Sequence, residues 1–207
     1  MFKRLLAAAA LFFASTFAFA QSIHTELATP LNTGAGNKIE VVEFFWYGCP
    51  HCYALEPQVQ EWSAKLPADV EFKRIPAPAN EVWKVAARIF YALDALGLQQ
   101  KLHKPFFDAV QTERLRPTNT QQLDDWLSRQ GVDVARFHAA ESSFAVESKL
   151  KRAGQLFDQS QSSGVPTIVV DGRYVIEMAK AQTPERMMAA VNSAIEVARK
   201  NRAAAKK

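Results

Sequence analysis

The sequence predicts an α/β fold in which an all-helical segment is inserted between two parts of one mixed sheet. Three observations support this. Residues 38–75 read as strand, helix and strand, residues 79–149 carry only helical periodicity, and residues 167–195 return to a β-hairpin followed by a helix. Parallel strands joined by a crossover need helices on the faces of the sheet, and this order supplies them. We therefore expect a sheet domain made of residues 21–78 and 150–207, with a helical insertion at residues 79–149.

Residues 1–20 are typical of a secretory signal peptide. A basic start, Met1-Phe2-Lys3-Arg4, precedes a nearly continuous apolar run, and Ala18-Phe19-Ala20 resembles a small-x-small cleavage site. The apolar run is short for a membrane span, although an uncleaved anchor is the alternative. Cleavage after Ala20 removes two basic residues and no acid, so the formal net charge falls from +4 to +2. Such a small excess gives no reason to expect binding to nucleic acid.

The first strand after a loop at residues 28–37 is predicted at residues 38–46. This segment is nearly all apolar, as is typical of a central strand covered on both faces. Glu43 interrupts it, and a buried carboxylate is costly unless it is paired or protonated. Either the strand exposes one face, or Glu43 is functional. Its position shortly before Cys49 favours a functional role.

The rest of the chain gives one more strand, a series of helices and a hairpin. A helix is expected at residues 50–65 and a strand at residues 70–75. In the insertion we expect a helix at residues 82–96 ended by Gly97, a short helix at residues 98–102 that restarts at Pro105, a helix capped by Thr120, and one long stretch at residues 133–163. The Asp171-Gly172 turn predicts a hairpin, and Thr183-Pro184-Glu185 begins a last helix.

The only two cysteines stand in Cys49-Pro50-His51-Cys52, between the first strand and the first helix. A strand that ends at Cys-X-X-Cys and opens a helix is a redox arrangement. Cys49 falls at the helix N-terminus, where unpaired N–H groups and the macrodipole favour a negative charge. Pro50 suits the first helical position because its missing donor is not needed there. We therefore expect Cys49 to be the attacking thiolate and Cys52 the resolving thiol.

Three other uses of the cysteine pair fit the sequence less well. A structural disulfide that closes so short a loop stabilises the chain little. A zinc site usually needs four ligands, and the chain has no second Cys or Cys/His pair. A c-type haem site needs histidine directly after the second cysteine, and residue 53 is Tyr53. Dithiol–disulfide chemistry is therefore the favoured interpretation.

Three stretches together resemble the DsbA family of periplasmic disulfide oxidoreductases. They are Val41-Val42-Glu43-Phe44-Phe45, Cys49-Pro50-His51-Cys52-Tyr53, and Gly164-Val165-Pro166-Thr167, which is similar to the cis-proline loop of the family. The resemblance implies a thioredoxin fold with an inserted all-helical domain. It also implies a protein thiol:disulfide oxidoreductase that donates its Cys49–Cys52 disulfide to newly exported proteins. No bound cofactor is implied, because the cysteines carry the electrons.

The resemblance also implies roles for residues around the cysteines. Glu43, Glu56 and Lys73 match charged residues that lie near the buried cysteine in the family and are expected to relay its proton. Val165 and Pro166 are expected to bind substrate, with the bond between them in the cis form. His51 and the helix N-terminus are expected to stabilise the Cys49 thiolate and so to make the protein an oxidant.

The expected partners and location follow from the same resemblance. Partners are folding exported proteins with free thiols and a quinone-linked membrane oxidase like DsbB, which reoxidises the dithiol. We expect a monomer in the periplasm. Three alternatives stay open from sequence: an isomerase or reductase on the same fold, a glutathione-handling enzyme with a similar insertion, and a non-catalytic export chaperone. The export signal and the presence of Cys52 argue against the glutathione-handling class.

Overall fold

A computed structural model describes residues 23–32, 34 and 36–205 of the chain. Within these residues, one five-stranded sheet has the order β1-β5-β4-β2-β3. The central strand β2 pairs in parallel with β3 and antiparallel with β4. The strands are β1 (His24–Glu26), β2 (Ile39–Phe45), β3 (Val70–Pro76), β4 (Thr167–Val170) and β5 (Tyr174–Glu177). This mixed sheet, with an all-helical insertion after β3, confirms the predicted fold class.

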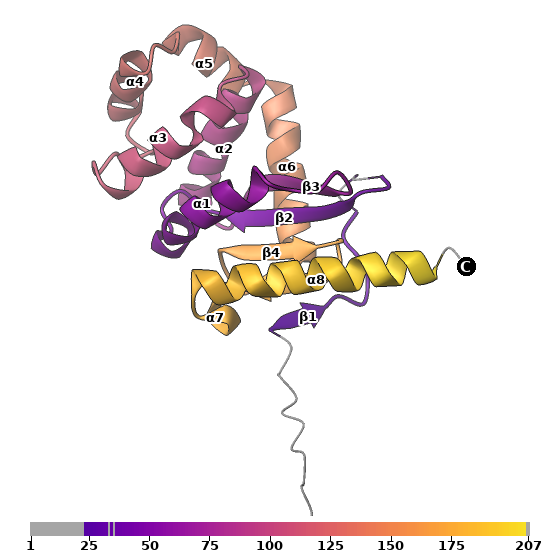
Figure 1. Cartoon of the computed structure of the whole chain (residues 1–207). Helices are drawn as coiled ribbons and strands as arrows, with labels where there is room; N and C mark the ends of the chain where they lie inside the picture. The colour runs from indigo at the N-terminus through magenta and orange to yellow at the C-terminus, as the bar shows by residue number, and fades with distance from the viewer. Residues whose placement is uncertain (1–22, 33, 35, 206–207) are drawn as a thin grey trace, which may run out of the picture.

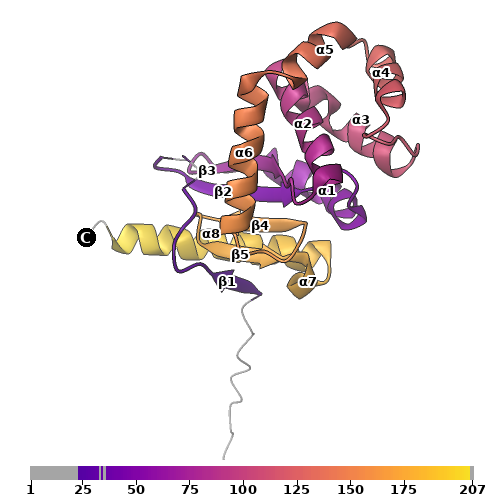
Figure 2. The same cartoon turned by 180° about the vertical axis from the view of Figure 1, so that it is seen from behind.

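Helices cover both faces of the sheet. On one face, α1 (Pro50–Ser63) and the last helix α8 (Pro184–Ala204) bury a core with β2, β4 and β5, as Figure 1 shows. On the other face, the C-terminal half of α6 (Phe144–Gln159) packs against β2, β4 and β5, which the reverse view in Figure 2 shows. The short helix α7 (Met178–Ala181) links β5 to α8. Because β2 is buried along its whole length, every side chain it carries must be apolar or have a partner.

The helical insertion lies at one end of the sheet. It consists of α2 (Glu81–Ala95), α3 (Gln99–Gln111), α4 (Thr120–Arg129), α5 (Val134–Glu141) and the first half of α6. Its core is continuous with the end of β2 and with both cysteines. The predicted boundary between residues 149 and 150 falls inside α6, which runs unbroken from the insertion to the sheet (Figure 2).

Several predictions of local structure are confirmed. The first strand, the helix at Pro50 and the hairpin appear where they were expected. Asp171 and Gly172 both have positive φ, which is the geometry of a type I′ turn. Thr183 caps α8, and Gly97 adopts positive φ directly after the end of α2 and its C-cap Leu96.

Other predictions of local structure are wrong for identifiable reasons. We expected a break at Pro105, yet α3 continues through it. The lost hydrogen bond is offset by burial of Phe106 and Phe107. The expected long stretch from Asp133 is two helices, because Ser143 caps a new helix with its side chain. The cap of α4 is Asn119 rather than Thr120, and neither β1 nor α7 was predicted, since both are very short.

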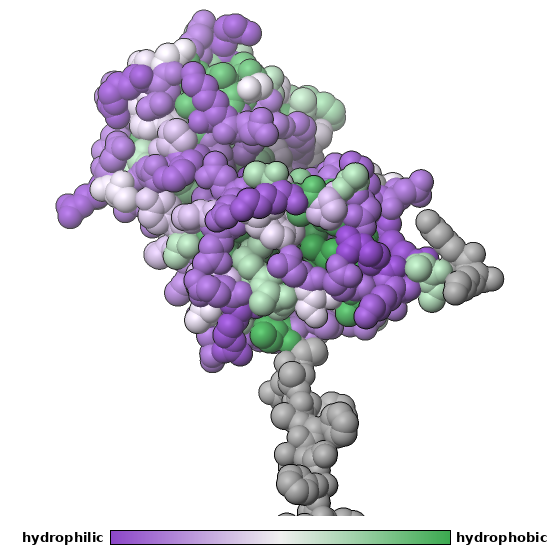
Figure 3. All heavy atoms as spheres, in the orientation of Figure 1, coloured by the Kyte–Doolittle hydropathy of each residue, from purple (hydrophilic) through white to green (hydrophobic). Residues whose placement is uncertain are grey.

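The surface in the orientation of Figure 1 is mostly polar, with apolar residues in small patches (Figure 3). Among residues 23–32, 34 and 36–205, no helix is both long enough and apolar enough to cross a membrane. The predicted signal peptide at residues 1–20 lies outside the described residues.

Candidate active site

The two cysteines lie at the N-terminus of α1, directly after the loop that follows β2. Cys49 is the N-cap of α1, with extended backbone angles, and its Sγ accepts a hydrogen bond from the Cys52 backbone N–H at 3.3 Å. Pro50 occupies the first turn, as predicted. Both cysteines are free thiols, so the structure represents the dithiol form.

The same helix gives the two thiols opposite acidities. The pKa of Cys49 is lowered to about 6, chiefly by a hydrogen bond from the Cys52 thiol. The backbone N–H groups of Cys52 and His51 and the charge of His51 lower it further, while burial opposes the shift. Cys52 is fully buried. Burial, and the hydrogen bond that its thiol donates to Cys49, raise the pKa of Cys52. At neutral pH the site therefore presents one thiolate and holds one protonated thiol behind it.

A proline loop faces the thiolate from the other side. The Val165–Pro166 peptide bond is cis, which confirms the sequence prediction. Cys49 Sγ lies 3.4 Å from the Val165 carbonyl oxygen, to which it donates a hydrogen bond when the thiol is protonated. The Thr167 hydroxyl donates to the Gly164 carbonyl at 2.7 Å and so fixes the turn before β4. An extended peptide that reached Cys49 would meet the Val165 backbone beside it.

Glu43 lies in the sheet behind the cysteines and is 1 % exposed, so the alternative of an exposed strand face is excluded. Its carboxyl faces the guanidinium of Arg74 on β3, with 3.3 Å between Oε2 and Nε. Burial raises the pKa of Glu43 to about 7, although the charge of Arg74 opposes the shift. Near neutral pH this carboxyl can therefore either accept or release a proton.

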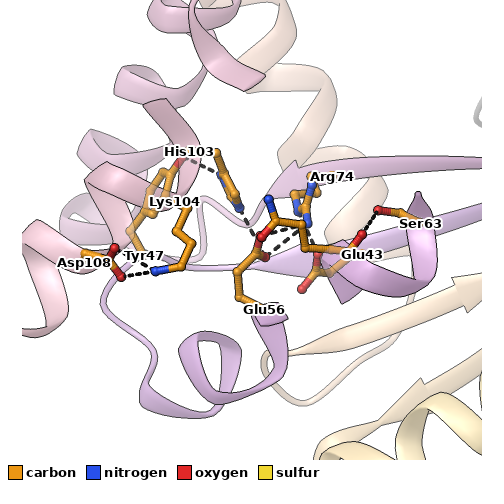
Figure 4. Close-up of polar contacts among 9 residues, drawn as sticks. Glu43, Tyr47, Glu56, Ser63, Arg74, His103, Lys104 and Asp108 are labelled. Carbon is orange, nitrogen blue, oxygen red and sulfur yellow. Dashed lines mark hydrogen bonds and ion pairs between the residues drawn. The ribbon is translucent and has the colours of Figure 1, made fainter. Parts of the chain in front are cut away.

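Arg74 also binds Glu56, the second predicted carboxylate. Its Nη2 contacts both carboxyl oxygens of Glu56, at 3.0 and 3.1 Å. Glu56 is buried on α1. Figure 4 shows the Arg74 side chain between the two carboxyl groups. One guanidinium thus lies between two buried carboxyl groups and carries a single positive charge for both.

Lys73 does not join this cluster, so the expectation that it forms one relay with Glu43 and Glu56 is wrong. Its Nζ pairs with Glu40 at 2.6 Å and lies 3.7 Å from Glu71. The physical reason is strand alternation: successive side chains point to opposite faces of a sheet. Because Glu43 is in register with Arg74, the side chain on its own face is Arg74, and Lys73 serves the other face.

Three further contacts at the site were not predicted from sequence. Tyr47 donates or accepts a hydrogen bond with Nδ1 of His103 on α3 at 2.9 Å, and His103 Nε2 lies 3.3 Å from Glu56. The ring of Trp46 stacks on Trp83 of α2, with centroids 4.7 Å apart. Each pair is distant in sequence, and no local pattern marks either one.

The stacked Trp46 ring also explains the glycine before Cys49. A Cβ atom at Gly48 would overlap the Trp46 ring, which stacks on Trp83. The loop that carries Cys49 therefore requires glycine at this position.

Comparison with known proteins identifies the family. Residues 40–192 match the family model described as DSBA-like thioredoxin domain. The thiol:disulfide interchange protein DsbA of Pseudomonas aeruginosa is 40% identical over 184 residues, which cover 89% of this chain and 86% of that protein. DsbA of Azotobacter vinelandii is 38% identical over 84% of this chain and 81% of its own length. The chain belongs to the DsbA family.

Solved structures agree with the sequence comparison. The crystal structure of Pseudomonas aeruginosa DsbA superposes with a TM-score of 0.82 at 40% identity, covering 90% of this chain and 95% of that one. DsbA from Xylella fastidiosa superposes with a TM-score of 0.79 at 29% identity, covering 85% and 95%. The fold is therefore the thioredoxin fold with a helical insertion, and the protein is a thiol:disulfide oxidoreductase of the DsbA type that acts as a disulfide oxidase.

Proposed function

We propose that this protein is exported to the periplasm, where Cys49 receives thiol-bearing substrate proteins. A substrate thiolate attacks Cys49 Sγ of the oxidised protein, the Cys49–Cys52 bond breaks, and the Cys52 thiolate takes up a proton. A second substrate thiolate then attacks the substrate sulfur of the mixed disulfide and releases the Cys49 thiolate. Two electrons pass from the substrate to the protein, which is left as the dithiol. The asymmetric acidity of Cys49 and Cys52 is the observation that supports this direction.

The other site residues have roles that follow from their positions. The Val165 backbone aligns the substrate strand beside Cys49, with Pro166 fixing the loop. Glu43 accepts and returns the proton of Cys52, since its pKa of about 7 suits that exchange. Glu56 and Arg74 set the charge around Glu43. His51 and Pro50 complete the start of the helix that stabilises the Cys49 thiolate.

The dithiol needs an oxidant before it can act again. We assign this to a quinone-linked membrane oxidase of the DsbB kind, which would accept the two electrons through a mixed disulfide with Cys49. The protein works as a monomer. It needs no bound cofactor, because the two cysteine sulfurs carry the electrons of the exchange.

Trapping of covalent adducts tests the roles of the two cysteines. Cys52→Ala keeps the Cys49 sulfur and removes the thiol that would reverse a mixed disulfide. Loaded as a Cys49–glutathione mixed disulfide, it should accumulate adducts with exported thiol proteins, because a substrate thiolate attacks the Cys49 sulfur and glutathione thiolate leaves. Cys49→Ala is the matched control and should trap few. Adducts are separated on non-reducing gels after alkylation and identified by mass spectrometry. Equal trapping by the two variants would contradict the assignment of Cys49 as the sulfur that bonds to the substrate.

A further inference from the structure

His103 is a buried histidine that the exchange chemistry does not use directly. It lies on α3 of the helical insertion and is 4% exposed. Its ring bridges two buried groups of the sheet domain, with Nδ1 2.9 Å from the Tyr47 hydroxyl and Nε2 3.3 Å from Glu56 Oε2. Figure 4 shows the resulting row of side chains from Tyr47 through His103, Glu56 and Arg74 to Glu43.

The environment of His103 fixes its protonation. Burial raises the pKa of Tyr47, so this side chain stays a hydroxyl and has a proton to donate. Burial also lowers the pKa of His103, so the ring is neutral near pH 7. A neutral imidazole has one donor and one acceptor nitrogen. We assign the Tyr47 hydroxyl as the donor to Nδ1, because a carboxylate only accepts and Nε2, 3.3 Å from Glu56 Oε2, then carries the ring proton; this second contact is close but lies outside hydrogen-bond geometry.

Arg74 divides its donors unevenly between the two carboxyl groups. Its Nη2 meets both oxygens of Glu56 at hydrogen-bond distance. Its Nε faces Glu43 Oε2 at 3.3 Å without hydrogen-bond geometry, and neither atom has a hydrogen-bond partner elsewhere among the described residues. Arg74 therefore interacts more strongly with Glu56 than with Glu43.

We propose that His103 is a positioning residue for Glu43: by sharing Glu56 with Arg74, it keeps part of the guanidinium charge directed at Glu43. If the Nε2 contact is lost, Arg74 is the only hydrogen-bonded cation left to Glu56 among the described residues and moves closer to it, while the charge of Lys104 on α3 acts on Glu56 without a hydrogen bond. Glu43 then loses part of its counter-charge and binds its proton more tightly. The helical insertion would in this way tune a carboxyl group of the sheet domain whose named charge partners, Arg74, Glu56 and Cys49, all lie outside the insertion.

The groups that bear on this coupling come from several elements. Those acting on Glu43 are Arg74 of β3, Glu56 of α1 and the Cys49 sulfur at the start of α1. Those facing His103 are Tyr47 of the loop before α1, together with Glu56 and Arg74. The kinetic consequence of this inference rests on the proposed function, in which Glu43 is the proton acceptor. The coupling itself does not, because the protonation of Glu43 can be measured directly.

Two amide variants separate the contacts of His103. An asparagine amide reaches the position of Nδ1, so His103→Asn retains a partner for Tyr47 and loses the contact with Glu56. A glutamine amide reaches the position of Nε2, so His103→Gln retains a donor to Glu56. Neither amide titrates. The two variants are similar in polarity and are matched for any general disturbance of the core.

The decisive measurement is the pH midpoint of Glu43 protonation in the reduced protein. It is read by carboxyl ¹³C NMR of glutamate-labelled protein, and the signal is assigned by its absence in Glu43→Gln. His103→Asn should raise the midpoint by about half a unit, or about threefold in proton affinity. His103→Gln should leave it within error of the wild type.

An unchanged or lower midpoint in His103→Asn would overturn the inference, and so would equal shifts in both variants, because a structural disturbance does not distinguish the two amides. If His103→Asn does not fold, a midpoint in His103→Gln that differs from wild type overturns it as well, and an unchanged midpoint supports it. Release of a mixed disulfide with glutathione, followed against pH, is measured in parallel. A shift in the NMR midpoint without a shift in the rate profile refutes the role of Glu43 in exchange while the coupling from His103 stands.

Discussion

Removing the Cys49 thiolate should destabilise the reduced protein at pH 8 and have almost no electrostatic effect at pH 5. In the folded protein the pKa of Cys49 is about 6, whereas that of a free cysteine is about 8.5. Because the folded value is the lower one, the thiolate contributes its full stabilisation above pH ~8.5 and loses it as the pH falls through about 6. Cys49 is only 6% exposed, so solvent screens this contribution little.

The expected magnitude follows from these two pKa values. The linkage relation gives the thiolate about 2.5 kcal/mol of stabilisation at pH 8, about 1.4 kcal/mol at pH 7 and less than about 0.1 kcal/mol at pH 5. The disulfide form has no thiolate and gains none of this. At pH 7 the same energy corresponds to about 30 mV in a two-electron potential. The reduced protein should therefore be favoured over the oxidised protein, as an oxidant requires.

The assay is urea unfolding of the reduced wild type and of Cys49→Ala between pH 5 and pH 8, with a phosphine reductant present. The difference in the free energy of unfolding between the two proteins should grow by about 2.5 kcal/mol over this range. Glu43 titrates in the same window and is present in both proteins, so most of its contribution cancels; the Cys49 charge is the smallest of the named influences on the Glu43 pKa. The oxidised wild type should follow the pH dependence of the variant. A difference that is flat, or that falls as the pH rises, would refute the reasoning.

Two further predictions concern the residues next to Cys49. His51→Ala should raise the Cys49 pKa by about 0.5–1 unit, because it removes an exposed nearby charge while the backbone donors of α1 remain. Thiolate absorbance titration measures this pKa. Equilibration with glutathione should show the reduction potential falling by about 30 mV per pKa unit. Gly48→Ala should lower the free energy of unfolding by about 1–3 kcal/mol, because the new methyl group displaces the Trp46 ring from Trp83. Denaturant unfolding measures this loss of stability. Unchanged tryptophan fluorescence in the variant would contradict the explanation.

The parts of the site that could be predicted from sequence depend on local chemistry. The Cys49 thiolate follows from its place at a helix start, and the turn at Pro166 follows from a proline before a strand. Both signals lie within a few residues of the group they describe. The fold class could be predicted for a similar reason, because the strands and helices of the sheet domain have clear periodicity.

The partners of the buried charges could not be predicted, because they depend on register and on contacts between distant segments. Lys73 and Arg74 are adjacent cations, and only the pairing of β2 with β3 decides which one meets Glu43. His103 is separated from Tyr47 by 56 residues in sequence. An isolated histidine on an amphipathic helix gives no sign that it bridges two domains.

These contacts make the helical insertion a part of the active site rather than an independent attachment. The loop between β2 and α1 is held on one side by the Trp46–Trp83 stack with α2 and on another by the Tyr47–His103 hydrogen bond with α3. Gln111 of α3 also donates to the Tyr47 carbonyl at 2.7 Å. The position of Cys49 at the end of this loop, and with it the set of donors that lowers its pKa, therefore depends on helices that contribute no reacting atom. A change in the packing of α2 or α3 should alter the redox chemistry before it alters the sheet.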